Sequence, residues 1–272
     1  MAILHMMKSL TDTICESFVY ETDGAVLVID GGFETECEAL YAKLREAGGK
    51  VTGWFFTHPH EDHYGAFIKL MEDHGDEIKV EKLYYHFPTD EEVKAGDPRF
   101  FEDMHRDYMV RMQKMIAENG VETVVMKKGD EYTFGDTKIL VLREPDPELK
   151  VNYINNYDTV FRMDINGKRV MFLGDLGAEA GDQLLETVPA EELKCDYVQM
   201  AHHGQNGVRR NVYEAIRADY CLWCTPTWLW DNMGPEGYDT GNFKTVIVRG
   251  WMSEIKAKKH YVNMNGPYAI EL

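Results

Sequence analysis

Three histidines and an aspartate lie within six consecutive positions of this chain, at His58, His60, Asp62 and His63. Imidazole and carboxylate groups are the usual donors of zinc, iron and manganese sites in proteins. A polar turn that is rich in histidine is the simpler interpretation. We favour a metal site, because further residues with ligand-type side chains follow along the chain.

Those further residues come directly after two apolar runs that are typical of buried strands. The run 169–173 ends at Gly174 and Asp175, and the run 197–201 ends at His202 and His203. The first motif likewise follows the apolar run 51–56. Loops held at the ends of strands in a rigid sheet can bring distant side chains together around a cation.

These motifs resemble those of the metallo-β-lactamase fold hydrolases. The His-x-His-x-Asp-His pattern is matched at residues 58–63, the bridging aspartate by Asp175, and an early aspartate by Asp30. Within that superfamily, the segments 172–175 and 202–204 are most similar to the soluble catalytic module of the competence-protein (ComEC/Rec2) type. The resemblance implies a four-layer αβ/βα sandwich and a site that holds two divalent metal ions.

The resemblance also implies a role for each matched residue. One metal ion would be held by His58, His60 and Asp175, and a second by Asp62, His63, Asp175 and one of the two late histidines. We expect His202 to be that ligand, and His203, together with Asp62, to serve proton transfer, although the sequence does not distinguish the two histidines. Zinc is the favoured metal, while manganese and iron also accept such donors.

One position departs from the family pattern. Most members carry a further histidine between the first motif and the bridging aspartate, whereas this chain has Asn155 and Asn156 in that region. Water or an amide oxygen would then complete the first metal site. The competence-type branch also tends to show asparagine there.

We expect a hydrolase in which a metal-activated water attacks a phosphodiester or a small ester. Flavo-diiron oxidoreductases of this fold typically carry a glutamate in place of His60, which favours hydrolysis here. Asp30 is expected to support the ligand loop. The alternative is a non-catalytic, metal-stabilised binding or scaffold domain, suggested by the missing histidine.

Composition narrows the substrate class. The 272 residues include 29 Lys and Arg against 47 Asp and Glu, so the formal net charge is −18. Because proteins that bind nucleic acids depend on cationic side chains to neutralise phosphates, we expect a small-molecule substrate rather than nucleic acid. No membrane span or targeting signal is visible, and five cysteines form no disulfide framework, which predicts a cytoplasmic protein.

Two cysteines, Cys221 and Cys224, match the C-x-x-C pattern of redox or zinc pairs. They fall on a predicted strand, where residues three apart point to opposite faces. We therefore interpret them as two separate buried thiols.

The whole chain, residues 1–272, is expected to form one α/β domain of two strand-rich halves with helices outside, and the site between the halves. Each half combines runs typical of strands and helices, and a helical insertion near residues 88–120 is predicted to begin with a charged loop at 88–98, followed by a helix at 99–119 that carries an apolar stripe. That stripe could pack in the core or form a lid over the site. The aromatic loop at 226–240 could line a pocket or an oligomer interface. The predicted strands are 2–7, 17–21, 25–29, 51–56, 79–86, 131–134, 138–142, 159–165, 169–173, 197–201, 220–224 and 260–263.

Overall fold

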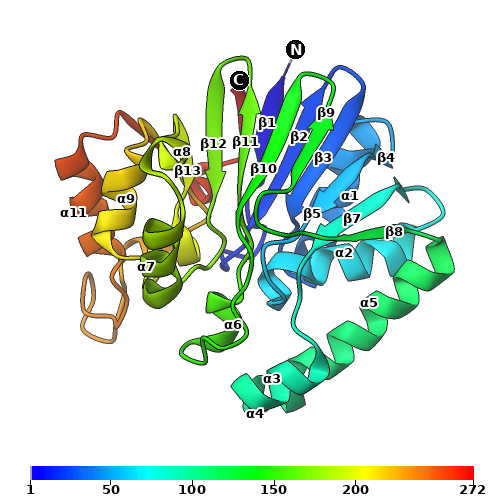
Figure 1. Cartoon of the computed structure of the whole chain (residues 1–272), viewed down its shortest axis with the longest axis horizontal. Coiled ribbons are helices and arrows are strands. Elements are labelled where there is room, and N and C mark those ends of the chain that lie inside the picture. Colours follow the sequence, from blue (N-terminus) through cyan, green and yellow to red (C-terminus); the bar gives the residue numbers. More distant parts are fainter. Residues whose placement is uncertain (1) are drawn as a thin grey trace.

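The computed structural model describes residues 2–272, so only Met1 lies outside it. Two seven-stranded sheets face each other, and helices cover the outer face of each sheet (Figure 1). The predicted four-layer αβ/βα sandwich is confirmed. None of the described helices combines the length and the hydropathy that crossing a bilayer requires.

The N-terminal sheet has the strand order β16-β1-β2-β3-β5-β7-β8. The strands β3, β5, β7 and β8 run parallel to one another, while β16, β1, β2 and β3 pair antiparallel. The strands span Ile3–Met6 (β1), Ser17–Thr22 (β2), Ala25–Asp30 (β3), Gly53–Phe55 (β5), Lys82–Tyr85 (β7), Glu122–Val125 (β8) and Tyr268–Glu271 (β16). The helices of this half are α1 (Cys37–Glu46), α2 (Glu61–His74), α3 (Asp90–Gly96), α4 (Pro98–Phe100) and α5 (Arg106–Asn119).

The C-terminal sheet has the order β15-β14-β13-β12-β11-β10-β9, and its strands β12 to β15 run parallel. Its strands span Glu131–Phe134 (β9), Thr137–Arg143 (β10), Val160–Ile165 (β11), Lys168–Phe172 (β12), Tyr197–Gln199 (β13), Tyr220–Trp223 (β14) and Lys259–Val262 (β15). The helices are α6 (Tyr153–Asn156), α7 (Ala178–Thr187), α8 (Ala190–Leu193), α9 (Arg210–Ile216), α10 (Thr227–Trp230) and α11 (Thr245–Ile255).

Alternation along the strands explains why both faces of each sheet are buried. In β2, Phe18 and Tyr20 enter the core between the sheets, while Val19 packs in the core beneath the helices of the first half. Phe18 meets Phe172 of the opposite sheet at a ring-centroid distance of 5.4 Å. Because successive side chains of a strand point to opposite faces, one strand supplies both cores.

The two cysteines of the C-x-x-C pattern lie on opposite faces, as predicted. Cys221 belongs to the core under the helices of the second half, and Cys224 to the core between the sheets. Both thiols are free and buried. A shared metal or a disulfide between them is therefore not supported.

Several elements differ from the sequence prediction. The strands β8 and β16 were not predicted, and β16 closes the first sheet by pairing with β1. The predicted strand 51–56 is split, because Lys50–Val51 (β4) pairs with Lys79–Val80 (β6) in a separate small sheet. The predicted loop at 88–98 contains α3, whose first turn is closed by a reciprocal capping box between Thr89 and Glu92.

The insertion after β7 packs against two parts of the molecule. One is the core of the first half, and the other is the end of the molecule where the strands β5 and β12 finish. Met112 and Met115 of α5 are buried against the helices of the first half. At the other end, Phe101 packs with α3 and with Tyr153 and Ile154 of α6. Figure 1 shows α3 and α4 at the end of α5 that lies near α6.

Candidate metal centre

The histidines and aspartates singled out in the sequence converge at the carboxyl ends of β5, β12 and β13. His58 and His60 follow β5, and Asp62 and His63 open α2. Asp175 follows β12 and completes the group. All of these side chains are buried except that of His60, which is partly exposed. The site therefore lies between the two halves, as predicted.

One group consists of Asp62, His63, Asp175 and His203, with one ligand atom of each within 4.8 Å of the others. His203 Nε2 lies 2.8 Å from Asp62 Oδ2 and 3.4 Å from Asp175 Oδ1. His63 Nε2 lies 3.3 Å from Asp175 Oδ1. None of these four buried atoms makes a hydrogen bond with any described residue. Unpaired buried polar atoms are costly, so four that converge on one point fit a bound cation.

A second group consists of His58, His60 and Asp175. His58 Nε2 lies 2.9 Å from His60 Nδ1 and 3.9 Å from Asp175 Oδ2. Burial, reinforced by the neighbouring histidine, lowers the pKa of His58 to about 3, and the pKa of His60 likewise. Both rings are therefore neutral near pH 7, which is the form that binds metals.

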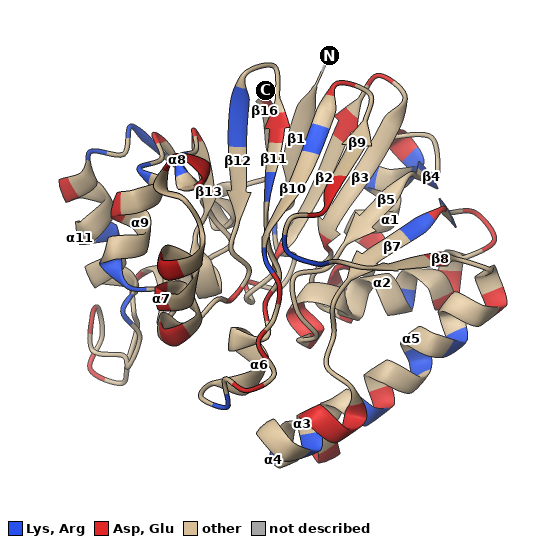
Figure 2. Cartoon of the chain, in the orientation of Figure 1, with Lys and Arg blue, Asp and Glu red and all other residues tan. Residues whose placement is uncertain are grey.

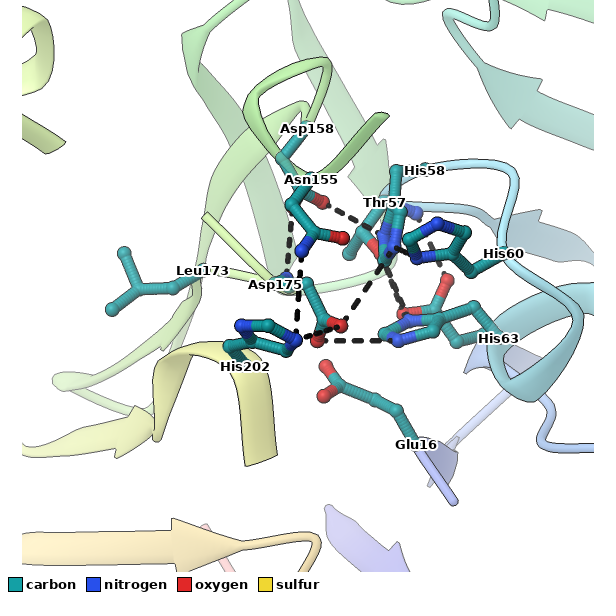
Figure 3. A network of polar contacts seen from close by, with 12 residues as sticks. Glu16, Thr57, His58, His60, His63, Asn155, Asp158, Leu173, Asp175 and His202 are labelled. Atoms are coloured by element: carbon teal, nitrogen blue, oxygen red, sulfur yellow. Dashed lines mark hydrogen bonds and ion pairs between the residues drawn. The ribbon is translucent and has the colours of Figure 1, made fainter. Parts of the chain in front are cut away.

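Asp175 joins the two groups through its two oxygens. Its Oδ1 faces His63 and His203, whereas its Oδ2 faces His58 and, at 3.6 Å, His202 Nε2 (Figure 3). Burial acts to raise the pKa of Asp175, but the surrounding histidines outweigh it and hold the pKa well below its usual range. The carboxylate is thus charged and lies between the two groups of candidate ligands.

The pKa of His203 is shifted in the opposite direction to that of Asp175. Burial acts to lower the pKa of His203, but the carboxylates of Asp175 and Asp62 raise it to about 10. The first group is therefore a place where positive charge is favoured.

Each inward-facing imidazole is held through its other ring nitrogen. His63 Nδ1 lies 2.9 Å from Asp30 Oδ2, and Asp30 also accepts hydrogen bonds from Thr57 N and Oγ1 at 2.9 and 2.8 Å. His203 Nδ1 lies 3.1 Å from the carbonyl oxygen of Cys224, and His58 Nδ1 lies 3.2 Å from Asp158 Oδ1. Such contacts orient the rings and direct Nε2 toward the site, where His58 Nε2 meets His60 Nδ1 at 2.9 Å.

Unusual backbone geometry delivers the late histidines. His202 and His203 have φ of 53° and 55°, in the left-handed region that β-carbon sterics disfavour by about 1–2 kcal/mol per residue. Gly204 follows with φ of 80°, and a β-carbon there would collide with the ring of Trp223. Strained backbone of this kind is concentrated at functional sites.

The structure assigns different positions to the two late histidines, a choice that the sequence left open. His203, expected to serve proton transfer, lies in the group with Asp62 and His63. His202, expected to be the ligand, lies outside that group, with its side chain 20% exposed and its Nε2 3.5 Å from Asn155 Nδ2. The geometry thus favours the reverse of the expected assignment.

Asn155 belongs to the segment in which the family resemblance predicted a further histidine. It lies on α6, and its Oδ1 is buried without a hydrogen-bond partner among the described residues. Figure 3 shows this oxygen pointing toward His58 and His60. An amide oxygen is therefore available beside the second group.

Two acidic residues at the site were not identified from the sequence. Asp158 Oδ2 accepts a hydrogen bond from the backbone N of Asp175 at 2.8 Å. Glu16, fully buried at the start of β2, accepts a hydrogen bond from Gln199 Nε2 at 2.6 Å and points its carboxylate toward Asp175 and His63 (Figure 3). Burial raises the pKa of both carboxyls. The only sequence signal for Glu16 is an acidic residue directly before an apolar strand.

Phe100 from the insertion covers the partly exposed side of the site. Its ring lies edge-on to His60 at a centroid distance of 5.1 Å. The insertion therefore supplies core packing through α5 and a wall beside the metal centre through α4.

Comparison with known proteins gives one family match. A family model described as the metallo-beta-lactamase superfamily matches residues 10–219. No curated protein matches the sequence.

Solved structures with a similar fold are distant in sequence. The metallo-beta-lactamase fold protein YhfI from Bacillus subtilis has 10% identity and a TM-score of 0.59, covering 99% of this chain and 100% of that one. The metallo hydrolase Igni18 from Ignicoccus hospitalis has 15% identity and a TM-score of 0.55, covering 100% of both chains. CmlA from Streptomyces venezuelae, a diiron beta-hydroxylase, has 10% identity and a TM-score of 0.62, covering 100% of this chain and 54% of that one.

Proposed function

This chain belongs to the metallo-beta-lactamase superfamily, and on that premise we propose that it is a metal-dependent hydrolase acting on a small phosphodiester or ester. The observation that carries the proposal is the convergence of four buried ligand atoms that contact one another but form no hydrogen bond with a described residue. That arrangement costs stability unless a cation occupies it.

The residues divide into two sets of donors. One ion would be held by Asp62, His63, His203 and the Oδ1 of Asp175. The other would be held by His58, His60 and the Oδ2 of Asp175, with the Asn155 amide oxygen beside them. Nitrogen and carboxylate donors favour zinc, while manganese and iron are alternatives.

Two such ions, when bound, lower the pKa of a bound water towards neutrality and so supply a nucleophile at neutral pH. The chain provides the surroundings for that chemistry. Asp30 and Asp158 hold His63 and His58 in orientation. Phe100 packs against the ring of His60, and Asn155 of α6 lies 3.5 Å from His202 Nε2.

His202 is the residue we assign to proton transfer to the leaving group. It lies beside Asp175 but outside the group of ligands around His203, and its side chain is partly exposed. Histidine is the side chain that most often serves in general acid–base catalysis, and the imidazolium form of His202 would donate the proton.

A small substrate fits the charge around the site. The helix α7 begins three residues after Asp175, and α3 packs beside α6. Both helices carry acidic residues, as Figure 2 shows. Acidic surroundings and a net charge of −18 disfavour a long polyanion such as DNA. The resemblance of segments 172–175 and 202–204 to the competence-protein type supports phosphodiester chemistry.

The proposal is tested by metal analysis of protein purified without added metal, followed by assays with bis-p-nitrophenyl phosphate and a p-nitrophenyl ester. Asp175→Asn, which preserves shape but removes the bridging charge, should lose metal and activity together while remaining folded. Asp12→Asn, a surface substitution, serves as control. Bound metal with no turnover on either substrate would instead favour the scaffold alternative, and oxygen consumption with an iron-loaded sample would favour oxidative chemistry.

A further inference from the structure

A cavity lies at the far edge of the C-terminal sheet, between α10, α11 and the edge strand β15. Its volume is about 340 Å³, and Trp230, Val246, Arg249, Gly250 and His260 line it. Of these lining residues, all of which the structure describes, none is acidic and none belongs to the candidate metal centre. The volume is within the range of small-molecule sites.

Arg249 is held in place without a neutralising partner. Its guanidinium lies 4.3 Å from the centroid of the Trp230 ring, and its Nη1 donates to the Trp230 carbonyl oxygen at 2.7 Å. No carboxylate lies within 4 Å of Arg249 in the described part of the chain, although the sequence has 47 acidic residues. The remaining N–H groups of the guanidinium fork are free to bind an oxyanion.

His260 offers a second donor to the same cavity. Its Nδ1 accepts a hydrogen bond from Trp223 Nε1 at 2.9 Å, so the proton of the neutral ring is on Nε2. Burial, together with the charge of Arg249, lowers the pKa of His260. The ring therefore stays a neutral N–H donor near pH 7.

Gly250 leaves the cavity open. It lies inside the helix α11, where glycine costs roughly 1 kcal/mol relative to alanine. A β-carbon there would meet no atom within 4 Å, so close packing does not account for the glycine. A side chain at this position would narrow the space beside Arg249.

We propose that this cavity binds a small molecule that carries a carboxylate or phosphate group. This anionic group contacts the guanidinium of Arg249 and the Nε2–H of His260, beside the ring of Trp230. The site is separate from the metal centre and does not depend on the proposed hydrolase function. It also assigns a role to Trp230 in the aromatic loop, for which the sequence left open a pocket or an interface.

The test is a calorimetric titration of the full-length, metal-loaded protein with inorganic phosphate and, separately, with benzoate. Ionic strength is kept constant, and chloride serves as the reference anion. Arg249→Gln should weaken binding of the preferred anion roughly 10-fold or more, the usual effect of losing a charge-assisted hydrogen bond. Arg210→Gln, which removes an arginine from the adjacent helix α9, should leave binding unchanged. Preference for phosphate or for benzoate distinguishes the two anion classes.

Gly250→Leu is an independent test of the proposal, because it does not alter the charge of the cavity. It should abolish binding by filling the cavity while leaving the melting temperature unchanged or higher, since leucine is a better helix former. Gly250→Ala should retain binding. If neither anion binds, or if binding persists in both Arg249→Gln and Gly250→Leu, the proposal is wrong.

Discussion

His203 Nε2 and Asp62 Oδ2 lie 2.8 Å apart in the buried site, and each also faces a second member of the group, Asp175 Oδ1 at 3.4 Å and His63 Nε2 at 3.6 Å. Four ligand-type atoms are thus directed at the same small volume. This relationship places His203, rather than His202, with the ligands.

The two histidines should therefore give different phenotypes. His203→Ala should lower the metal content from two equivalents to one, because it removes a donor that the buried group cannot replace. His202→Ala should retain metal and lower kcat by roughly 10²–10⁴-fold on esters with poor leaving groups. Elemental analysis and assays across a leaving-group series measure both effects.

A proton donor matters less when the leaving group is already stable, so p-nitrophenyl substrates provide the internal control for His202→Ala. An equal loss of rate on good and poor leaving groups would contradict the proton-transfer role. Loss of one metal in His202→Ala, with full retention in His203→Ala, would reverse the assignment.

Asp30→Asn should weaken metal binding without unfolding the protein. Thr57 N donates to Asp30 Oδ1, whereas His63 Nδ1 faces Oδ2, so the single oxygen of asparagine cannot serve both atoms and the His63 tautomer is no longer fixed. Losses of roughly 10–100-fold in metal affinity are usual for such contacts. Competition with a chromogenic chelator measures the affinity. An unchanged affinity would show that Thr57 alone orients the ligand loop.

Gln199→Leu should destabilise the junction between the two sheets. Gln199 accepts a hydrogen bond from Leu173 N at 2.8 Å and donates to Glu16 Oε2 at 2.6 Å, all in the buried core. Each group left unpaired costs about 1–3 kcal/mol of unfolding free energy. Urea unfolding of the metal-free protein measures the loss. Glu16→Gln preserves an acceptor for Gln199 and should change stability much less.

The stability of the packing between α2 and α5 should depend on pH through Glu72. Arg111 donates to Glu72 from Nε and Nη2 at 2.9 and 2.8 Å, and this contact holds the pKa of Glu72 below its ordinary value of 4.5. A depressed carboxyl pKa stabilises the fold above pH 4.5, and the contribution is lost as the pH falls through the lowered pKa.

Glu72→Gln should therefore lower the free energy of unfolding at pH 7 and with it the melting temperature. The loss should be on the order of 1 kcal/mol or less, since the pair is partly exposed. The difference should shrink as the pH falls below 4.5. Thermal unfolding followed by circular dichroism measures it, with Asp73→Asn as the neighbouring control. A difference that grows on acidification would contradict the assignment.

Much of the fold could be predicted from local patterns, and the misses share a cause. Alternation and turn residues identified most strands around the site, because each of these signals acts over a few residues. The strand β16 was missed, since its strand character depends on pairing with β1 at the other end of the chain. The helix α3 was missed because a charged segment hid its capping residues.

The sequence by itself determined which donor groups the site contains, because histidine and carboxylate side chains at the ends of apolar strands are brought together wherever the sheets form. Only the tertiary structure decided which late histidine faces Asp62 and His63. That choice depends on two consecutive positive φ angles, at His202 and His203, which the surrounding packing imposes. The tertiary structure also placed Glu16 beside the site, where it accepts a hydrogen bond from Gln199, 183 residues further along the chain. Contacts between such distant residues are fixed by how the two sheets stack, and no local pattern encodes them.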